Sequence, residues 1–294
     1  MENFRSGFVS IIGKPNVGKS TLLNRLIGFK LGIVSPKPQT TRVNVKGFLN
    51  DKNKQIIFLD TPGFLEPRYE LHNQMLRYIK TALIDVDIVI FITDLKTYPT
   101  EYDRKVLERI NMIDNISKIA VLNKTDLVNN NVIEKAIADL QDSDFDNIIP
   151  ISAKKNYNIE KLLDVLTSFL PFTPPFYSQE ELSDLPLRFF AKEVILEQIF
   201  LKFKQEIPYS TAVVVEEFKD KGNKVEIRAN IWVNSRSQKP ILLGKKGSKI
   251  KGVRLESQKE LYKLTGKRAK LDLWVKVKPG WRKKKNAIKE FGYK

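Results

Sequence analysis

The sequence contains no cysteine, one histidine and no long hydrophobic run. Without cysteine the chain has no disulfide, thiolate metal site or cysteine nucleophile, and it suits a reducing compartment. His72 alone cannot build a multi-histidine metal site. The longest mainly apolar run, residues 86–92, is far shorter than the roughly 20 residues that span a bilayer, and no signal-like segment precedes the first strand-like stretch. We therefore expect a cytoplasmic protein.

What the chain has in excess is positive charge, and the charge is unevenly placed. Residues 1–174 contain 23 basic and 20 acidic side chains, whereas the remaining 120 residues contain 28 basic and 14 acidic ones. A length of 294 residues allows two domains, and a hydrophobic content of 42% allows each to have a core. The second half is thus predicted to face a polyanion, with nucleic acid as first choice and an anionic membrane surface as the alternative.

In residues 1–172, strand-like runs alternate with amphipathic helical stretches such as 102–112 and 159–170. This order predicts an α/β domain with a mixed, mostly parallel sheet and helices on both faces. The expected strands are residues 8–12, 43–49, 55–59, 87–93, 118–122 and 148–151.

Residues 173–187 are rich in proline and acidic side chains, which predicts a linker. Residues 188–294 then follow an α-β-β-α-β order typical of a small α+β domain. Its expected elements are a helix at 188–204, strands at 211–218 and 224–233, a helix at 248–264 and a strand at 269–277.

The first domain carries the motif G-x-x-x-x-G-K-[ST] between a predicted strand and a predicted helix. Glycines let main-chain N–H groups turn inward around a phosphate at a helix N-terminus. Lys19 is expected to reach the β- and γ-phosphates, and the Ser20 hydroxyl is expected to bind Mg²⁺. The predicted nucleotide loop comprises Gly13, Lys14, Pro15, Asn16, Val17, Gly18, Lys19, Ser20 and Thr21.

Two further segments at strand ends indicate that the base is guanine. Asp126, in the sequence Asn123-Lys124-Thr125-Asp126, can accept hydrogen bonds from guanine N1–H and N2–H₂, a donor pair that adenine lacks. Asn123 would tie the loop together and the Lys124 stem would cover the base. Ser152, Ala153 and Lys154 supply a turn whose N–H could meet guanine O6. This set argues against an ATP-using enzyme or helicase.

The sequence Asp60-Thr61-Pro62-Gly63 completes the nucleotide site. Asp60 is expected to hold Mg²⁺ through water, and the Gly63 N–H to bind the γ-phosphate. We predict that the Thr41 hydroxyl completes the coordination shell of Mg²⁺. Thr40 is the alternative, because the spacing of the sequence does not distinguish the two threonines. Lys19, Thr41, Asp60 and Gly63 are therefore the expected catalytic residues.

Together GKPNVGKSTLLN, PQTTR, DTPG, NKTD and SAK resemble the translation-factor-related small GTPases and, within them, the Era family. The resemblance covers nearly the whole chain. It implies GTP hydrolysis to GDP, binding to small-subunit ribosomal RNA near its 3′ end, and a role in assembly of the 30S subunit. It also implies that Asn16 helps to hold K⁺ beside the phosphates; the alternative is that Asn16 is an ordinary turn residue. Peripheral membrane association is the second implication.

Phe64 stands where many GTPases carry a water-positioning glutamine. A phenyl ring cannot orient the attacking water, so intrinsic turnover is predicted to be slow. Arg42 could act as an arginine finger within the chain, but a solvated loop arginine is the preferred interpretation.

A second glycine–lysine loop, Gly244-Lys245-Lys246-Gly247, precedes the helix predicted from Ser248. Its α-β-β-α-β surroundings resemble a type II KH domain, whose GxxG loop clamps single-stranded nucleic acid. Its lysines, with Lys249, would neutralise phosphates. Ile241, Ile250 and Val253 could form an apolar floor under the bases or belong to the ordinary core.

The remaining predictions concern the tryptophans, Arg282, His72 and the oligomeric state. Trp281 and Arg282, in a basic tail, are expected to offer a stacking and phosphate-binding surface, unless the tail is simply solvated. Trp232 and Trp274 are expected in the core, and His72 to be structural or solvent-facing. No coiled-coil pattern is present, so a monomer is expected.

Overall fold

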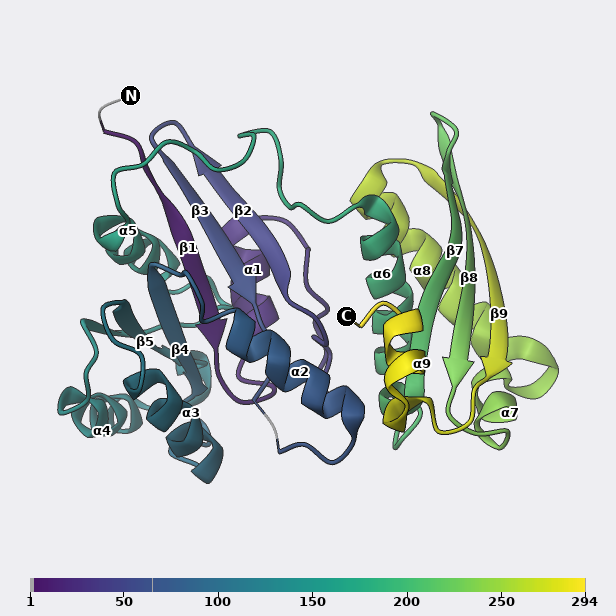
Figure 1. Ribbon diagram of the computed structural model, residues 1–294, viewed down its shortest axis with the longest axis horizontal. Coiled ribbons are helices and arrows are strands. Elements are labelled where there is room, and N and C mark those ends of the chain that lie inside the picture. The colour runs from purple at the N-terminus through teal and green to yellow at the C-terminus, as the bar shows by residue number, and fades with distance from the viewer. Residues whose placement is uncertain (1–2, 65, 294) are drawn as a thin grey trace. The chain divides into compact units, whose positions relative to one another are not determined.

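The first unit is built on a six-stranded sheet. The computed structural model describes residues 3–64 and 66–293 (Figure 1). The strand order is β2-β3-β1-β4-β5-β6, and only β2 runs antiparallel to its neighbour. All parallel strands therefore end at one edge, where loops gather. The strands are β1 (Arg5–Ile12), β2 (Val45–Asp51), β3 (Lys54–Asp60), β4 (Ile88–Asp94), β5 (Ser117–Asn123) and β6 (Asn147–Pro150).

Helices cover both faces of this sheet because its central strands are apolar on both sides. All seven residues of β4 are buried. One apolar cluster joins β4 and β5 to side chains of α2, α3 and α4, while α1 packs near α5. The helices are α1 (Lys19–Ile27), α2 (Glu70–Thr81), α3 (Glu101–Asn111), α4 (Asn130–Gln141) and α5 (Ile159–Phe169).

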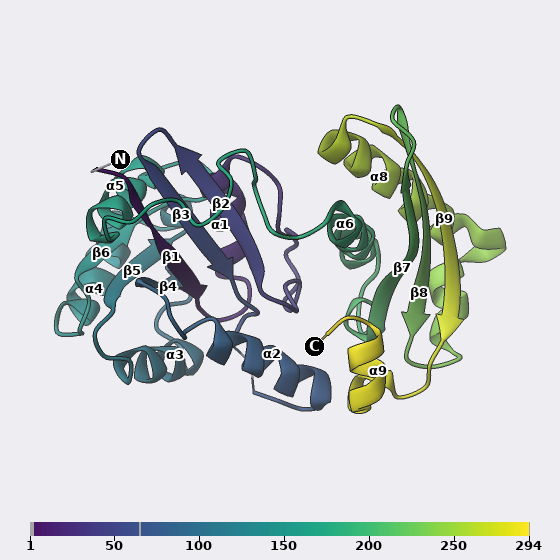
Figure 2. The same ribbon diagram turned by 45° about the horizontal axis from the view of Figure 1, so that its top comes forward.

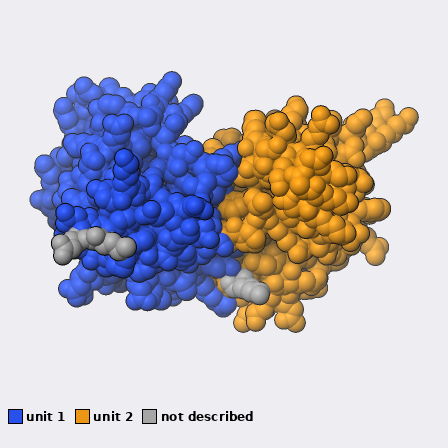
Figure 3. Space-filling model, turned by 90° about the horizontal axis from the view of Figure 1, so that it is seen from above, with its two compact units in different colours: residues 1–32, 41–66, 75–184 blue, residues 33–40, 67–74, 185–294 orange. Residues whose placement is uncertain are grey.

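The second unit has a three-stranded sheet with the order β7-β8-β9, in which β8 and β9 are parallel (Figure 2). Side chains of α6 and α8 form one apolar core with the strands. Figure 3 colours the two units; by their contacts, residues 33–40 and 67–74 group with 185–294. The elements are α6 (Leu187–Lys202), β7 (Thr211–Asp220), β8 (Lys224–Val233), α7 (Gln238–Leu243), α8 (Ser248–Thr265), β9 (Arg268–Val277) and α9 (Lys285–Glu290).

The proline-rich segment expected as a linker is bound to the first unit over most of its length. The Gln55 side chain donates to Tyr177 O at 2.9 Å and accepts from the N–H groups of Phe176 and Tyr177. The Phe48 N–H donates to Leu182 O at 2.9 Å, and the Tyr177 ring stacks on Phe48 at 4.2 Å. The segment therefore covers the exposed edge around β2, which would otherwise present unpaired main-chain groups. Unit 1 extends to residue 184.

Most predicted elements appear within one or two residues of their expected bounds. The α/β class of the first domain and the α+β class of the second are confirmed. Residues 241–243, expected as an apolar run before the GKKG loop, form the end of α7, and the basic tail ends in α9. None of the helices in the described part of the chain combines the length and the hydropathy that a membrane span needs.

Candidate functional site

The loop between β1 and α1 closes around the ammonium group of Lys19. Lys19 Nζ donates to the main-chain oxygens of Gly13 at 3.1 Å and Lys14 at 2.8 Å, and the side chain is buried. Burial lowers the pKa of Lys19 to about 8, and the Asp60 carboxylate offsets part of that shift. A bound polyphosphate would favour the charged form. Gly18 has a φ of 106°, a left-handed value that favours glycine at the start of α1. The loop thus offers an anion a buried cation and a helix N-terminus.

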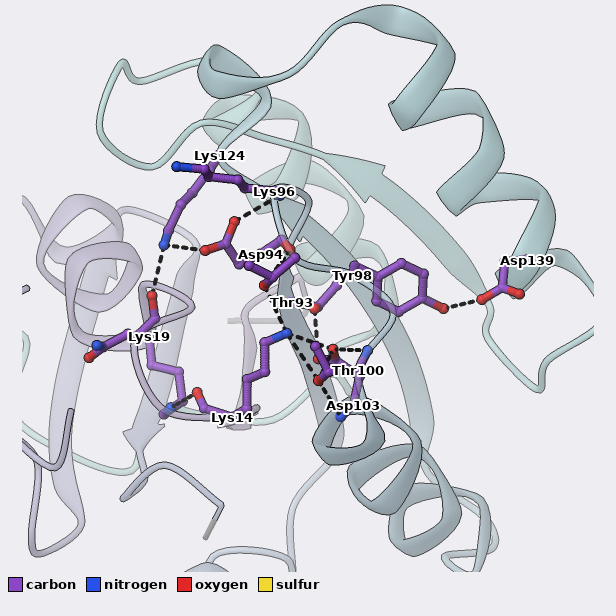
Figure 4. Close-up of polar contacts among 12 residues, drawn as sticks. Lys14, Lys19, Thr93, Asp94, Lys96, Tyr98, Thr100, Asp103, Lys124 and Asp139 are labelled. Atoms are coloured by element: carbon purple, nitrogen blue, oxygen red, sulfur yellow. Dashed lines mark hydrogen bonds and ion pairs between the residues drawn. The ribbon is translucent and has the colours of Figure 1, made fainter. Parts of the chain in front are cut away.

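The Lys14 side chain points away from this loop, toward the start of α3 (Figure 4). Its Nζ lies 2.7 Å from Asp103 Oδ2 and donates to Thr97 and Thr100 Oγ1 at 3.0 and 3.2 Å. Thr93 Oγ1 donates to the other Asp103 oxygen at 2.7 Å. Lys14 can therefore serve a nucleotide only through its main chain, while its side chain fixes the loop to α3.

Three oxygen-bearing side chains gather beside Lys19. Ser20 Oγ lies 2.9 Å from Thr41 Oγ1 and donates to Asp60 Oδ2 at 2.7 Å. Thr41 Oγ1 also donates to this Asp60 oxygen, at 3.2 Å. Asp60 Oδ1 is buried and has no hydrogen-bond partner among the described residues.

Burial raises the pKa of the Asp60 carboxyl, against the lowering effect of the Ser20 hydroxyl and of the Lys19 charge. An unpartnered buried carboxylate oxygen is costly unless a cation or water satisfies it. Hard oxygen donors are what Mg²⁺ prefers, so these residues fit that ion. Thr41 rather than Thr40 supplies the threonine hydroxyl of this cluster.

Gly63 packs directly on the phosphate loop. A Cβ at this position would lie 2.8 Å from Pro15 Cα, so a larger residue would push the two segments apart. Phe64 is 5% exposed, its N–H donates to Gly13 O at 3.1 Å, and its ring faces the Arg109 guanidinium at 4.4 Å. The ring belongs to the core beneath α3 and cannot position water.

The two segments predicted to recognise the base are joined by hydrogen bonds. Asn123 Nδ2 donates to Val17 O at 2.7 Å, and its Oδ1 accepts from the Ala153 N–H at 3.1 Å. Ser152 Oγ donates to Asp126 Oδ1 at 2.5 Å. Asn123 therefore holds the phosphate loop and the Ser152–Ala153 turn together, and Asp126 stays at the surface.

Sequence reasoning missed two residues that support these segments. Asp94, at the end of β4, pairs with Lys124 Nζ, which also donates to Asn16 O at 2.8 Å (Figure 4). Arg25 of α1 donates to Ala153 O at 3.2 Å. The position of Asp94 at the carboxyl end of a parallel strand was a usable signal. Arg25 gave none, because its partner lies far away in the sequence.

The second glycine–lysine loop is open. Gly244 and Gly247 have φ values of 73° and 77°, and the two lysines between them are exposed. A Cβ on Gly244 would lie 2.6 Å from the Lys249 side chain. The loop ends at Ser248, where the N-terminus of the 18-residue helix α8 adds positive potential. Ile250 packs on the core, and Ile241 is 43% exposed.

The predictions for two tryptophans are wrong. Trp281 is fully buried, donates from Nε1 to Ser210 O at 2.9 Å, and packs on the rings of Phe291 and Tyr293, so it cannot stack on a base. Trp274, expected in the core, is 61% exposed. Arg282 is partly buried.

His72 of α2 and Arg42, in the loop before β2, are both buried. His72 is 3% exposed and accepts a hydrogen bond from the Arg68 N–H at 3.2 Å, so the structural interpretation of His72 is confirmed. Arg42 is also 3% exposed, which contradicts its expected solvation.

Comparison with known proteins agrees with this geometry. Residues 8–124 match the family described as "50S ribosome-binding GTPase" and residues 206–282 match the KH domain family. Fold and site together define a P-loop GTPase with a C-terminal KH domain.

The chain is 40% identical to GTPase Era of Staphylococcus epidermidis, over 100% of this chain and 98% of the relative. It is 38% identical to GTPase Era of Halothermothrix orenii, over 99% of both. A solved point variant of Aquifex aeolicus Era bound to GDP.AlF4⁻ matches with a TM-score of 0.94 at 36% identity and 99% coverage of both chains. Era in complex with MgGDPNP and nucleotides 1506–1542 of 16S ribosomal RNA matches with a TM-score of 0.93, also at 36% identity and 99% coverage of both. This chain belongs to the Era GTPase family and is a GTP hydrolase.

Proposed function

We propose that this GTPase binds small-subunit ribosomal RNA near its 3′ end and acts in assembly of the 30S subunit. The observation that carries the proposal is the exposed Lys245–Lys246 pair, held between two glycines with positive φ at the N-terminus of α8. Such a loop lets main-chain and ammonium groups approach successive phosphates of one strand. A solved relative bound to a 16S fragment supports the choice of RNA.

In the nucleotide site we assign the phosphates to the loop and Lys19, and guanine to Asp126. Ser20 and Thr41 would hold Mg²⁺ directly and Asp60 through water; the ion would neutralise charge on the β- and γ-phosphates. Main-chain N–H groups at Gly63 would hold the γ-phosphate and release it after hydrolysis. Because Phe64 is in the core, no side chain from that position orients water, and slow turnover follows.

A monovalent cation is the proposed supplement to this chemistry. Asn16 has a φ of 66° and its main-chain oxygen accepts from Lys124, so the residue sits on the rim of the phosphate loop. GTP turnover should be several times faster in KCl than in NaCl at equal ionic strength, and Asn16→Ala should remove the difference. Equal rates in both salts for the unaltered protein would reject the K⁺ role.

The RNA proposal is tested by direct binding. A labelled oligoribonucleotide with the sequence of the 16S 3′ end should bind more tightly than a shuffled one at fixed salt. Lys245→Ala combined with Lys246→Ala should weaken binding to both, while Lys259→Ala on the exposed side of α8 should not. Unchanged affinity in the double variant would reject the clamp.

We further propose a cytoplasmic monomer. The membrane-surface alternative predicts that the protein sediments with anionic liposomes in the absence of RNA. The basic charge of the second half supports this alternative. Competition of liposome binding by the same oligoribonucleotide would show whether one basic surface serves both.

A further inference from the structure

The sheet of the second unit has one covered and one open face. Leu271, Leu273 and Val275 of β9 pack with the core formed by α6 and α8. Because side chains alternate along a strand, the residues between them lie on the other side, which we call the open face. Its central members are Arg228, Asn230, Trp232, Asp272, Trp274 and Lys276.

Trp274 lies on β9, an edge strand of the sheet, and is paired in register with Asn230 of the central strand β8. The other two tryptophans are sheltered: Trp281 is buried, and Trp232 stacks on Phe291, which follows α9, at 5.5 Å. Trp274 alone of the three is 61% exposed. A large exposed aromatic ring on a rigid strand is a common feature of binding sites.

Beside this ring lies a depression of about 450 Å³, lined by Glu216, Arg228, Asn230, Trp274 and Lys276. Its floor is ordered, since Asn230 is 5% exposed and donates its side-chain N–H to the Glu216 carboxylate. A volume of this size is within the range of small-ligand sites. It would accept one nucleotide.

The charges around the depression suit a nucleotide. Lys276 Nζ lies 5.4 Å above the Trp232 ring, and among the described residues no carboxylate lies within ion-pair distance of it. Arg228 is 3.5 Å from Glu217 at the surface, a contact that is weak in water. Glu216 offers acceptor oxygens to the amino or imino group of a base. The site thus combines a flat apolar ring, a cation and a polar edge.

We propose that this depression is a second RNA site, in which the base of an unpaired nucleotide stacks on Trp274 and its phosphate is paired by Lys276. It resembles the way in which open sheets of other folds bind single strands through exposed aromatics. Protein interfaces are depleted of lysine and glutamate at their centres, so a protein partner is the poorer fit here. The site is separate from GKKG, because α8 lies on the covered face.

The inference rests on the proposed function only for its ligand class, RNA, and can fail independently. The test therefore uses full-length protein carrying Lys245→Ala and Lys246→Ala, which disables the clamp. The probes are octaadenylate and octauridylate, which are too short to form hairpins, at one fixed salt concentration. Intrinsic tryptophan fluorescence and the anisotropy of labelled probe are the two readouts.

In that background, Trp274→Leu should weaken octaadenylate binding about five- to a hundredfold, because one base–ring stack is lost. Trp274→Phe keeps a ring and should bind nearly as the parent. Quenching by the probe should vanish in both variants, since Trp274 is the accessible emitter. Lys276→Ala should lower the salt slope by about 0.7, as expected for one phosphate contact on a single strand, whereas Lys224→Ala at the far end of β8 should change nothing.

Equal affinities for Trp274→Leu and Trp274→Phe, with equal thermal unfolding, would overturn the proposal. So would probe binding without any fluorescence change in the parent. A protein that self-associates through Trp274, shown by sedimentation of Trp274→Leu against the parent, would instead assign the open face to a second copy and also overturn the RNA site.

Discussion

The two glycine–lysine loops of this chain look alike in sequence and differ in burial. In the first loop, Lys19 is 6% exposed and main-chain oxygens of its own loop surround it. In the second, Lys245 and Lys246 are exposed. A buried cation inside a closed loop suits one small ligand whose charge is fixed in position. Exposed cations on an open loop suit a polymer that passes along the surface. The difference teaches that the surroundings of a glycine–lysine motif decide its ligand.

The largest expected effect comes from the buried lysine. Lys19→Ala should reduce GTP hydrolysis about a thousandfold or more, because a preorganised cation at the transferred phosphate is lost. Single-turnover phosphate release measures this. RNA affinity measured without nucleotide should be unchanged, and a matching loss there would contradict the separation of the two loops.

A second pair of variants compares two tryptophans of one unit. Trp281→Ala should lower the free energy of unfolding by about 3–5 kcal/mol, because a large buried ring and its hydrogen bond to Ser210 are removed. Trp274→Ala should change it by only about 0.5 kcal/mol, as exposed sites do. Urea unfolding followed by circular dichroism provides both values. Similar losses would mean that Trp274 is not exposed in solution.

A smaller effect is expected at Asp126, the carboxylate proposed to recognise guanine. Asp126→Asn should weaken GTP binding about a hundredfold, because one acceptor becomes a donor facing the N–H groups of guanine. It should weaken xanthosine triphosphate far less, since that base carries an oxygen at C2. Competition against a fluorescent GTP analogue measures both. A variant that keeps its preference for GTP would reject Asp126 as the base reader.

The smallest expected loss of function comes from changing the open loop, residues 244–247. Lys245→Ala with Lys246→Ala should weaken rRNA-end binding about tenfold at moderate salt and lower the slope of log affinity against log salt by about 1.4, as expected for two phosphates on a single strand. GTP turnover without RNA should stay at the level of the unaltered protein. A loss of turnover as large as that expected for Lys19→Ala would show that the two loops act as one site and would contradict their separation.

Local patterns sufficed to predict that the segments of the proposed nucleotide site lie together, because each segment is at the end of a strand. The phosphate loop follows β1, the Asp60 segment follows β3 and the Asn123 segment follows β5, so the parallel sheet brings them to one edge. Thr41 lies on a loop whose path depends on the whole unit. Its position beside Ser20 could not be read from spacing.

The errors have identifiable causes. Apolar residues alternate at 271, 273, 275 and 277, so Trp274 lies with Asp272 and Lys276 on the opposite face of the strand. This alternation indicates an exposed ring, and the prediction of a core residue overlooked it. Trp281 is buried by Ser210, Phe291 and Tyr293, contacts that a basic local sequence does not reveal. The proline-rich segment could be recognised as non-helical, but its hydrogen bonds to Gln55 depend on tertiary structure.

Photocrosslinking tests the division between the loops most directly. The unaltered protein, loaded with a non-hydrolysable GTP analogue, would be irradiated with a 16S 3′-end oligoribonucleotide that carries 4-thiouridine, and the attached peptides would be sequenced. Crosslinks should fall in residues 241–253, with any others at the open face around residues 274–276, and should be absent from residues 13–21. Crosslinks concentrated at residues 13–21, and competed away by the analogue, would contradict the account.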